Sequence, residues 1–361
     1  MEGLYLWYGM PSLSAQQVKS LARDCGFELC GVTTAEPAEE AGYYARWLAA
    51  GYGGEMPYLY GRRAEMRADP RTLLASARSV ICLGLLYNVP LPYSTRWSLE
   101  ERAWISRYAW AEDYHEVLRG RAEQLVERLS GLASFEWKIC VDTSPILERA
   151  YAQRAGVGWI GHNTCLINQQ IGSWVFLGEI LTSLELEPDE PAPFRCGTCR
   201  RCIDACPTQA IVKTGQPDGP AWALDSRLCI SYWTIELRGP IPVEHRSQTG
   251  AHVFGCDICQ DVCPWNRRAP STGDPALAAR HAAPPLERLA ALTEAEFSEM
   301  FRSSPVRRAR YAGFLRNVAV AMGNSGDAGF REPLERLGGH PEALVREHAA
   351  WALGRIEELR S

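Results

Sequence analysis

Cysteines are the residues of this sequence whose spacing most clearly predicts chemistry. Residues 196–207 read C-x2-C-x2-C-x3-C-P, and residues 256–264 read C-x2-C-x3-C-P. The first spacing is one that binds [4Fe-4S] clusters, and in two-cluster proteins its last cysteine ligates the other cluster. The second run lacks one cysteine, which Cys229 can supply. The two runs therefore predict a pair of iron–sulfur clusters.

Eight thiolates are the number that two [4Fe-4S] clusters require. We predict that one cluster is bound by Cys196, Cys199, Cys202 and Cys263, and the other by Cys206, Cys229, Cys256 and Cys259. Gly197 lets the backbone come close to the inorganic sulfides. The alternative is zinc, because paired C-x-x-C motifs also bind Zn²⁺. Zinc gives no reason for two C-x3-C-P endings, so we favour clusters.

The remaining cysteines and the N-terminus indicate the compartment. Five cysteines lie in apolar stretches and are expected to be core thiols, namely Cys25, Cys30, Cys82, Cys140 and Cys165. The first ten residues have neither a basic start nor an apolar core, unlike a signal peptide. No apolar run approaches the roughly eighteen residues of a membrane span. We expect a cytoplasmic protein whose cysteines are kept reduced, without a disulfide framework.

Strands and helices alternate in the part of the chain that precedes the cysteines. The apolar run 79–87 predicts a central strand, residues 27–33 and 136–141 predict two more, and Ser14 and Gln17 form a possible capping box for a helix. The alternation predicts an α/β domain over residues 1–187. It contains neither a G-x-G-x-x-G fingerprint nor a P-loop.

Two proline-bearing linkers, residues 187–193 and 269–275, divide the rest of the chain. We place a two-cluster domain at 194–268 and a helical domain at 276–361. Within the latter, residues 315–324 and 344–356 resemble each other, which is typical of HEAT-like helical repeats. The alternative is an ordinary amphipathic helix pair.

The distribution of charge is uneven. The net charge of −5 argues against indiscriminate binding of nucleic acids, but residues 302–316 contain five arginines and no acidic residue. Such a local basic stripe can contact phosphates. The alternative is a solvated basic face.

Several blocks of the sequence, taken together, resemble the epoxyqueuosine reductases, a cobalamin-dependent family that completes the queuosine base in tRNA. The resemblance extends from about residue 14 to 357 and rests on residues 67–70 (RADP), 106–115 (SRYAWAEDYH), 141–150 (VDTSPILERA), 155–163 (AGVGWIGHN), 227–236, 349–354 and the first cysteine run. It implies an α/β domain that binds cobalamin, a ferredoxin-like domain with two clusters, and C-terminal helical repeats.

The resemblance also implies a reaction. The clusters would reduce cob(II)alamin to cob(I)alamin, which attacks the epoxide of epoxyqueuosine in the anticodon loop. The epoxide oxygen needs a general acid to leave as water, and the family's acid matches Asp142. Burial beside the corrin is expected to raise the pKa of Asp142 and keep it protonated. From the residues alone, Asp142 could instead cap the helix after Pro145.

The resemblance implies further cofactor contacts, whereas the candidate tRNA contacts are inferred only from the charge of residues 302–316. Cobalamin contacts are implied at Arg67, Ser106, Asp142, Leu166, Leu177 and Ser231. Without the resemblance, Arg67 would be a surface residue and both leucines core residues. Residues 113–115 begin like a D-x-H-x-x-G cobalamin motif, but Leu118 replaces the glycine, so we expect a cap or core role for His115. Arg307, Arg308 and Arg310 are the leading candidates for tRNA phosphates.

Two other classes of protein remain open. A small-molecule cobalamin and iron–sulfur reductase, such as a reductive dehalogenase, should lack the repeats and usually carries an export signal. A non-enzymatic electron carrier would hold clusters and no corrinoid. For the tRNA enzyme we expect a monomer that receives electrons from an unidentified donor and has no membrane partner.

Overall fold

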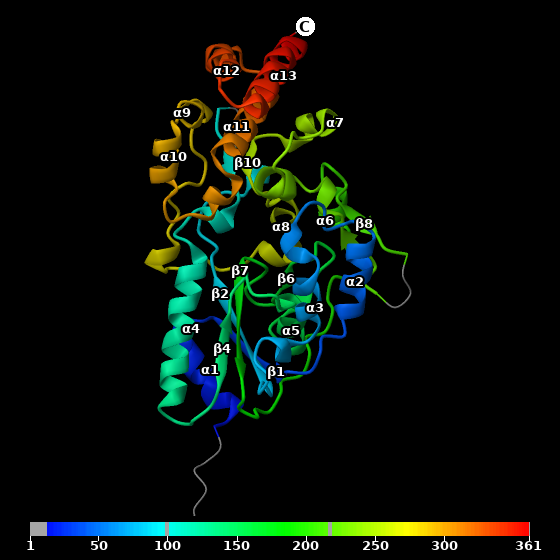
Figure 1. The fold of residues 1–361 in the computed structure, drawn as a ribbon, viewed down its shortest axis with the longest axis vertical. Coiled ribbons are helices and arrows are strands. Elements are labelled where there is room, and N and C mark those ends of the chain that lie inside the picture. Colours follow the sequence, from blue (N-terminus) through cyan, green and yellow to red (C-terminus); the bar gives the residue numbers. More distant parts are fainter. Residues whose placement is uncertain (1–12, 98–100, 216–218, 361) are drawn as a thin grey trace, which may run out of the picture.

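The computed structural model describes residues 13–97, 101–215 and 219–360 (Figure 1). A four-stranded sheet occupies the lower half, with the strand order β1 (Leu29–Thr34), β2 (Ser79–Leu86), β7 (Val175–Thr182) and β4 (Trp137–Cys140). Every residue of β2 is buried, in agreement with the apolar run that predicts a central strand. Strands and helices alternate along the chain, but each neighbouring pair in the sheet is antiparallel.

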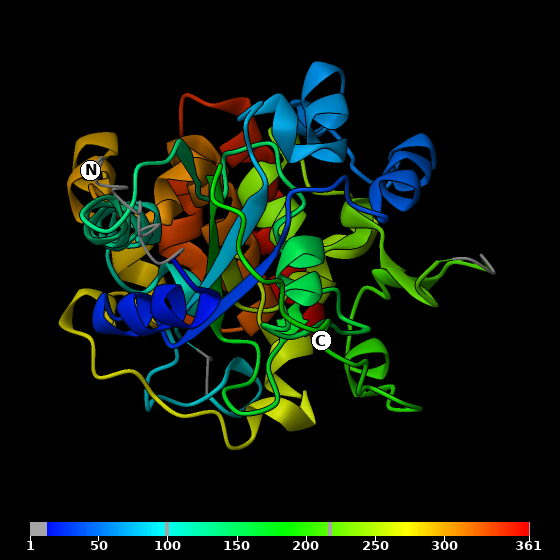
Figure 2. The same ribbon diagram turned by 90° about the horizontal axis from the view of Figure 1, so that it is seen from below.

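Helices cover both faces of the sheet (Figure 2). On one face, α1 (Ala15–Asp24) and α4 (Tyr114–Ser130) bury residues such as Val18 and Leu125 against Ile81 of β2. On the other face, α5 (Glu148–Arg154) packs Tyr151 against the sheet. The predicted capping box is confirmed at the start of α1, where Ser14 and Gln17 each accept a hydrogen bond from the other's backbone N–H. The remaining helices of this half are α2 (Ala41–Ala49) and α3 (Arg62–Ala68).

The cysteine-rich part is built from short elements. They are β5 (Trp159–Ile160) paired with β6 (Leu166–Ile167), α6 (Arg201–Asp204), the hairpin of β8 (Ile211–Lys213) and β9 (Trp222–Leu224), the π-helix Tyr232–Glu236, α7 (Val243–Arg246) and α8 (Ile258–Asp261). One further strand, β10 (His252–Phe254), pairs in parallel with β3 (Trp104–Ile105) and ties this part to the first half of the chain.

Five helices form the C-terminal part, α9 (Leu286–Ala290), α10 (Glu294–Met300), α11 (Tyr311–Ser325), α12 (Arg331–Gly338) and α13 (Ala343–Arg360). α11 is central and packs closely on α13, since a Cβ at Gly323 would lie 2.7 Å from Cα of Ala352. Trp104, Ile105 and Trp110 belong to the same core as these helices, although they precede the cysteines in sequence. No helix in the described ranges has the length and apolar character of a membrane span.

Candidate functional site

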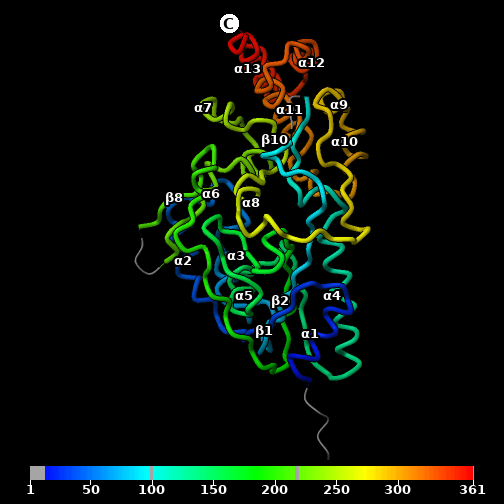
Figure 3. Tube along the Cα trace, turned by 180° about the vertical axis from the view of Figure 1, so that it is seen from behind, coloured from blue at the N-terminus to red at the C-terminus, as the bar shows by residue number. Residues whose placement is uncertain are grey.

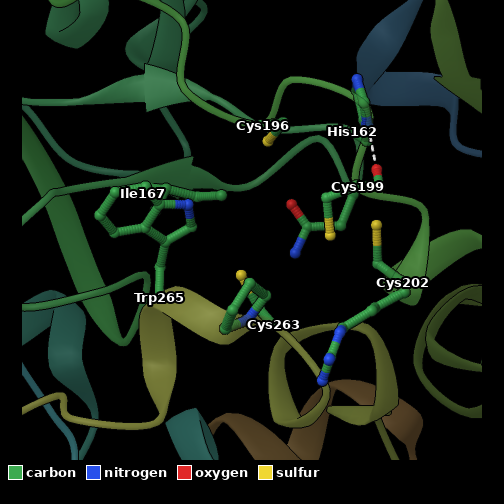
Figure 4. A pocket seen from close by; sticks show the side chains of 10 residues that line it. His162, Ile167, Cys196, Cys199, Cys202, Cys263 and Trp265 are labelled. Carbon is green, nitrogen blue, oxygen red and sulfur yellow. Dashed lines mark hydrogen bonds between the residues drawn. The ribbon is translucent and has the colours of Figure 1, made fainter.

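Four cysteines line one cavity of the cysteine-rich part, and their sulfur atoms point toward its centre (Figure 4). They are Cys196, Cys199, Cys202 and Cys263. Burial and the charges of the other three raise the pKa of the Cys202 thiol to about 12. Four thiolates this close together need a bound cationic centre to stay deprotonated. The cavity therefore suits a metal cluster held by sulfur.

The remaining three cysteines of the two runs, Cys206, Cys256 and Cys259, form a second group with Cys229. Burial and the charges of Cys229 and Cys206 raise the pKa of Cys256, and Cys259 lies near Cys256 and Cys229 in turn. Cys165 also belongs to this neighbourhood, because it shares a hydrogen bond with Cys259. Sequence reasoning treats Cys165 as an ordinary core thiol, and its spacing from the two runs gives no signal of this contact.

Asp142 lies two residues after the end of β4 and adopts a left-handed backbone conformation with φ of 43°. Its Oδ2 lies 3.0 Å from Nε2 of His115, whose Nδ1 lies 2.6 Å from Oδ1 of Asp113. Tyr114 stacks on the His115 ring at 4.1 Å and fixes its plane. The prediction of a cap or core role for His115 did not include this contact, in which its ring bridges two carboxylates. Asp142 does not cap α5, whose N-cap residue is Leu147.

The charge state of Asp142 differs from the sequence-based expectation. Burial acts to raise the pKa of Asp142, but the hydrogen bond and charge of His115 and the charge of Arg308 outweigh it and lower that pKa. Burial acts to lower the pKa of His115, while the hydrogen bonds to Asp113 and Asp142 raise it to about 9. In this arrangement the proton resides on His115, and the Asp142 side chain, 40% exposed, is ionised.

Asp142 has a further partner on the protein's inner side. The buried side chain of Glu148, in the first turn of α5, lies near the backbone N–H of Asp142, and its Oε1 has no hydrogen-bond partner among the residues described. Burial and the charge of Asp142 raise the pKa of Glu148. Glu179 of β7 is buried nearby, and neither of its carboxyl oxygens has a hydrogen-bond partner within the described part of the chain. Sequence patterns identify neither glutamate as part of the site.

An open cavity of about 510 Å³ adjoins the His115 ring. Its wall includes the aromatic rings of Tyr108 and Tyr114, the carboxylate of Asp113, and three arginines, Arg302, Arg307 and Arg308. Arg308 also pairs with Glu236, with 2.7 Å between Nε and Oε1. The cavity thus joins a proton-holding pair to a cationic rim, an arrangement that suits an anionic substrate.

The basic stripe is shorter than the sequence suggests. Arg307 and Arg308 line the cavity, and Arg310 is exposed just before α11. Arg316, in contrast, is buried and donates hydrogen bonds to the backbone carbonyls of Leu237 and Gly239, at 2.9 and 2.6 Å. The prediction that Arg316 belongs to a phosphate-binding stripe is therefore wrong, because its guanidinium is buried and hydrogen-bonded to main-chain carbonyls.

The residues implied as cobalamin contacts have mixed surroundings. The leucines among them, Leu166 and Leu177, pack in one apolar cluster between α5 and the sheet, and Ser231 hydrogen-bonds to the thiol of Cys229. Arg67 is buried and donates to the carbonyls of Tyr58 and Arg63, each at 3.0 Å. Ser106 is buried and donates to Asp257. Ser231 thus adjoins the second cysteine group through Cys229, the two leucines are apolar, and Arg67 and Ser106 are engaged by protein atoms.

Two grouped sets of cysteines and a separate acid–base pair on an arginine-rimmed cavity define an iron–sulfur oxidoreductase. Family models agree with this class. One described as "4Fe-4S double cluster binding domain" matches residues 195–266, and one described as "Epoxyqueuosine reductase QueG, DUF1730" matches residues 67–143.

Full-length relatives give the family. The chain is 41% identical to an epoxyqueuosine reductase of Xanthomonas campestris pv. campestris, over 96% of this chain and 97% of the relative, and 43% identical to one of Pseudomonas aeruginosa, over 96% of each. A crystal structure of epoxyqueuosine reductase with an epoxyqueuosine-modified tRNA-Tyr stem loop matches with a TM-score of 0.84 and 32% identity, over 94% of this chain and 89% of that one. The chain belongs to the epoxyqueuosine reductase family.

Proposed function

We propose that this protein reduces epoxyqueuosine to queuosine in the anticodon loop of tRNA, with Asp142 as the general acid. The observation that carries the proposal is the contact of Asp142 with His115 beside an arginine-rimmed cavity, in a chain that matches epoxyqueuosine reductases over nearly its full length. The match to a structure that contains a modified tRNA stem loop supports tRNA as the substrate.

The reaction sets what the site must supply. Conversion of the epoxide to an alkene removes its oxygen as water and consumes two electrons and two protons. The epoxide oxygen is a poor leaving group until it is protonated, and a positioned acid accelerates that step by about 10²- to 10⁴-fold. His115 and Asp142 hold one proton between them at the edge of the cavity. A proton passed through Asp142 to the epoxide oxygen would make that oxygen a better leaving group, and the two electrons and a second proton would complete its removal as water.

The electrons enter through two [4Fe-4S] clusters. The cysteines that line the first cavity would hold one, and the group around Cys256 the other. The match to a double-cluster domain supports this assignment. Cobalamin, when bound, would supply a low-valent cobalt that is both a strong reductant and a nucleophile. Leu166, Leu177 and Ser231 are the residues that would hold it, with Arg67 and Ser106 supporting the surrounding backbone.

The arginines of the cavity rim would bind the nucleic acid. Arg307, Arg308 and Arg310 are placed to neutralise phosphates of the anticodon arm, which positions the RNA without reading its sequence. The modified base must leave the loop's stack to enter the cavity, as bases do in other enzymes that act on them. The C-terminal helices, which we interpret as HEAT-like repeats, would extend this surface.

Conversion of a defined substrate tests the proposal. The reconstituted protein is incubated without oxygen with a stem loop that contains epoxyqueuosine, a chemical reductant, and cobalamin either present or omitted. Nucleosides are then measured by mass spectrometry. We expect queuosine to form only when cobalamin is present, and about eight iron and eight sulfide per chain in the active protein. Iron-loaded protein that binds cobalamin but forms no queuosine would contradict the proposal.

A further inference from the structure

A basic and aromatic surface surrounds the cavity of the first cysteine group. We call it the cluster-side patch and define it as Phe194, Arg195, Arg200, Arg201, Arg267 and Arg268. Arg201 lines the cavity itself, and Arg267 and Arg268 follow its lining residue Trp265. Phe194 is 55% exposed, which is unusual for so large an apolar side chain.

Aromatic side chains continue this surface inward. The ring of Phe194 lies 5.3 Å from that of His162, whose Nδ1 is 2.9 Å from the carbonyl oxygen of Cys199. The guanidinium of Arg200 lies over the Trp222 ring at 5.2 Å. The exposed ring of Phe194 therefore contacts His162, which in turn hydrogen-bonds to the cysteine loop at Cys199 (Figure 4).

The charges of the patch are largely uncompensated. In the part of the chain that the structure describes, four of its five arginines form no ion pair, and only Arg200 has an acidic partner, Asp204 at 3.4 Å. Asp204 is the only acidic residue within 194–206 and 262–268. The patch is therefore locally positive, although the chain as a whole carries a net charge of −5.

The patch lies away from the cavity beside Asp142. α6, which carries Arg201, and α10, which precedes the arginine-rimmed segment, lie on opposite sides of the molecule (Figures 1 and 3). The second cysteine group is the one that approaches the Asp142 cavity, because Asp257 accepts a hydrogen bond from Ser106, two residues before the cavity residue Tyr108. The first group therefore faces outward and the second inward.

We propose that the cluster-side patch is the docking surface for a small acidic electron-transfer protein. The inference rests on the proposed function only in taking the cysteine groups as cluster ligands. The donor loses one electron and the outward cluster gains it, and two such transfers supply one reduction of the epoxide. Opposite charges steer such partners together and raise association rates by about 10- to 10³-fold. The exposed ring of Phe194 supplies an apolar anchor at the centre of a small, transient interface.

The test uses the full-length, cluster-loaded protein and reduced flavodoxin, an acidic one-electron donor, as the probe. We compare wild type with the double variant Arg195→Glu/Arg268→Glu. The control variant, Arg23→Glu/Lys138→Glu, makes the same change of net charge at two exposed positions on α1 and β4, and lies away from the patch. Rates are read as loss of cluster absorbance, and affinity for oxidised flavodoxin is measured separately by calorimetry.

We expect flavodoxin to reduce the patch variant at least 10-fold more slowly than wild type at low salt, with weaker binding and a flatter salt dependence. Dithionite, a small reductant, should reduce all three proteins equally, which shows that the clusters are intact. Phe194→Ala should weaken binding while leaving the salt dependence unchanged.

Equal flavodoxin rates and affinities for the patch variant and wild type would overturn the proposal. It would also be overturned if the variant lost affinity for the tRNA stem loop instead, since the patch would then be an RNA surface. Because these measurements read cluster reduction and donor binding, a protein that failed to convert epoxyqueuosine would still test this inference.

Discussion

The Nε2 atom of His115 lies 3.0 Å from Oδ2 of Asp142, and the other nitrogen of the same ring lies 2.6 Å from Asp113. An imidazole between two carboxylates is held as the imidazolium. His115 therefore carries the proton, and the Asp142 carboxylate beside it can accept that proton. If Asp142 is the acid, His115 is the residue that reloads it.

Removal of the imidazole should change the pH dependence of the reaction. The pKa of His115 is raised to about 9, so the proton is present below that pH and is lost as the pH rises through it. In His115→Gln we expect kcat to fall about 100-fold near neutral pH and its alkaline limb to move to lower pH. Asp113→Asn should give a smaller shift in the same direction. A profile identical to that of wild type would remove His115 from the proton path.

Glu148 should matter because it holds the backbone of Asp142 rather than because it reacts. Glu148→Ala removes the buried carboxyl group beside the Asp142 backbone, and we expect kcat to fall about 10- to 100-fold with little change in KM, since small displacements of a reacting group are costly. Glu148→Gln keeps an acceptor oxygen and should restore most of the rate. Equal losses in both variants would indicate that the charge of Glu148 is what counts.

The buried Glu179 should make stability depend on pH. Burial and the charge of Glu148 raise the pKa of Glu179 in the folded protein, so its protonated form is favoured by folding. That contribution is complete below the unfolded-state pKa and is lost as the pH rises through the folded-state pKa. Glu179→Gln should therefore be more stable than wild type at pH 8, by at least about 1 kcal/mol, and nearly equal at pH 4. Denaturation curves that show the same difference at both pH values would contradict this.

Charge reversal at the cavity rim should weaken tRNA binding in a salt-dependent manner. Arg307→Glu removes an exposed cation from the wall of the cavity, and the slope of log affinity against log salt should become shallower by about one unit. Arg23→Glu, on α1, is the matched exposed control and should leave the slope unchanged. An unaltered slope in Arg307→Glu would show that this arginine does not contact a tRNA phosphate.

Local patterns predicted much of the fold. The apolar run of β2 and the capping box at Ser14 depend on neighbours within a few residues, so both could be read from the sequence. The same is true of the cysteine loop, where Gly197 has a φ of 54°. These features need no knowledge of how distant elements pack.

Tertiary contacts explain what could not be predicted. His115 and Asp142 are 27 residues apart and meet only because the start of α4 lies beside the end of β4. Arg316 looks like its exposed neighbours until the fold places it against the carbonyls of Leu237 and Gly239. Glu179 lies within an apolar strand, where no periodic signal distinguishes a buried carboxyl from a surface one.

A single-turnover experiment with Asp142→Asn tests the central claim most directly. The variant is loaded with clusters and cobalamin, reduced, and mixed with a stem loop that contains epoxyqueuosine, and queuosine is measured by mass spectrometry over time. We expect normal cofactor content, unchanged stem-loop binding, and formation of queuosine at least 100-fold slower than in wild type. Formation of queuosine at the wild-type rate would show that Asp142 is not the acid.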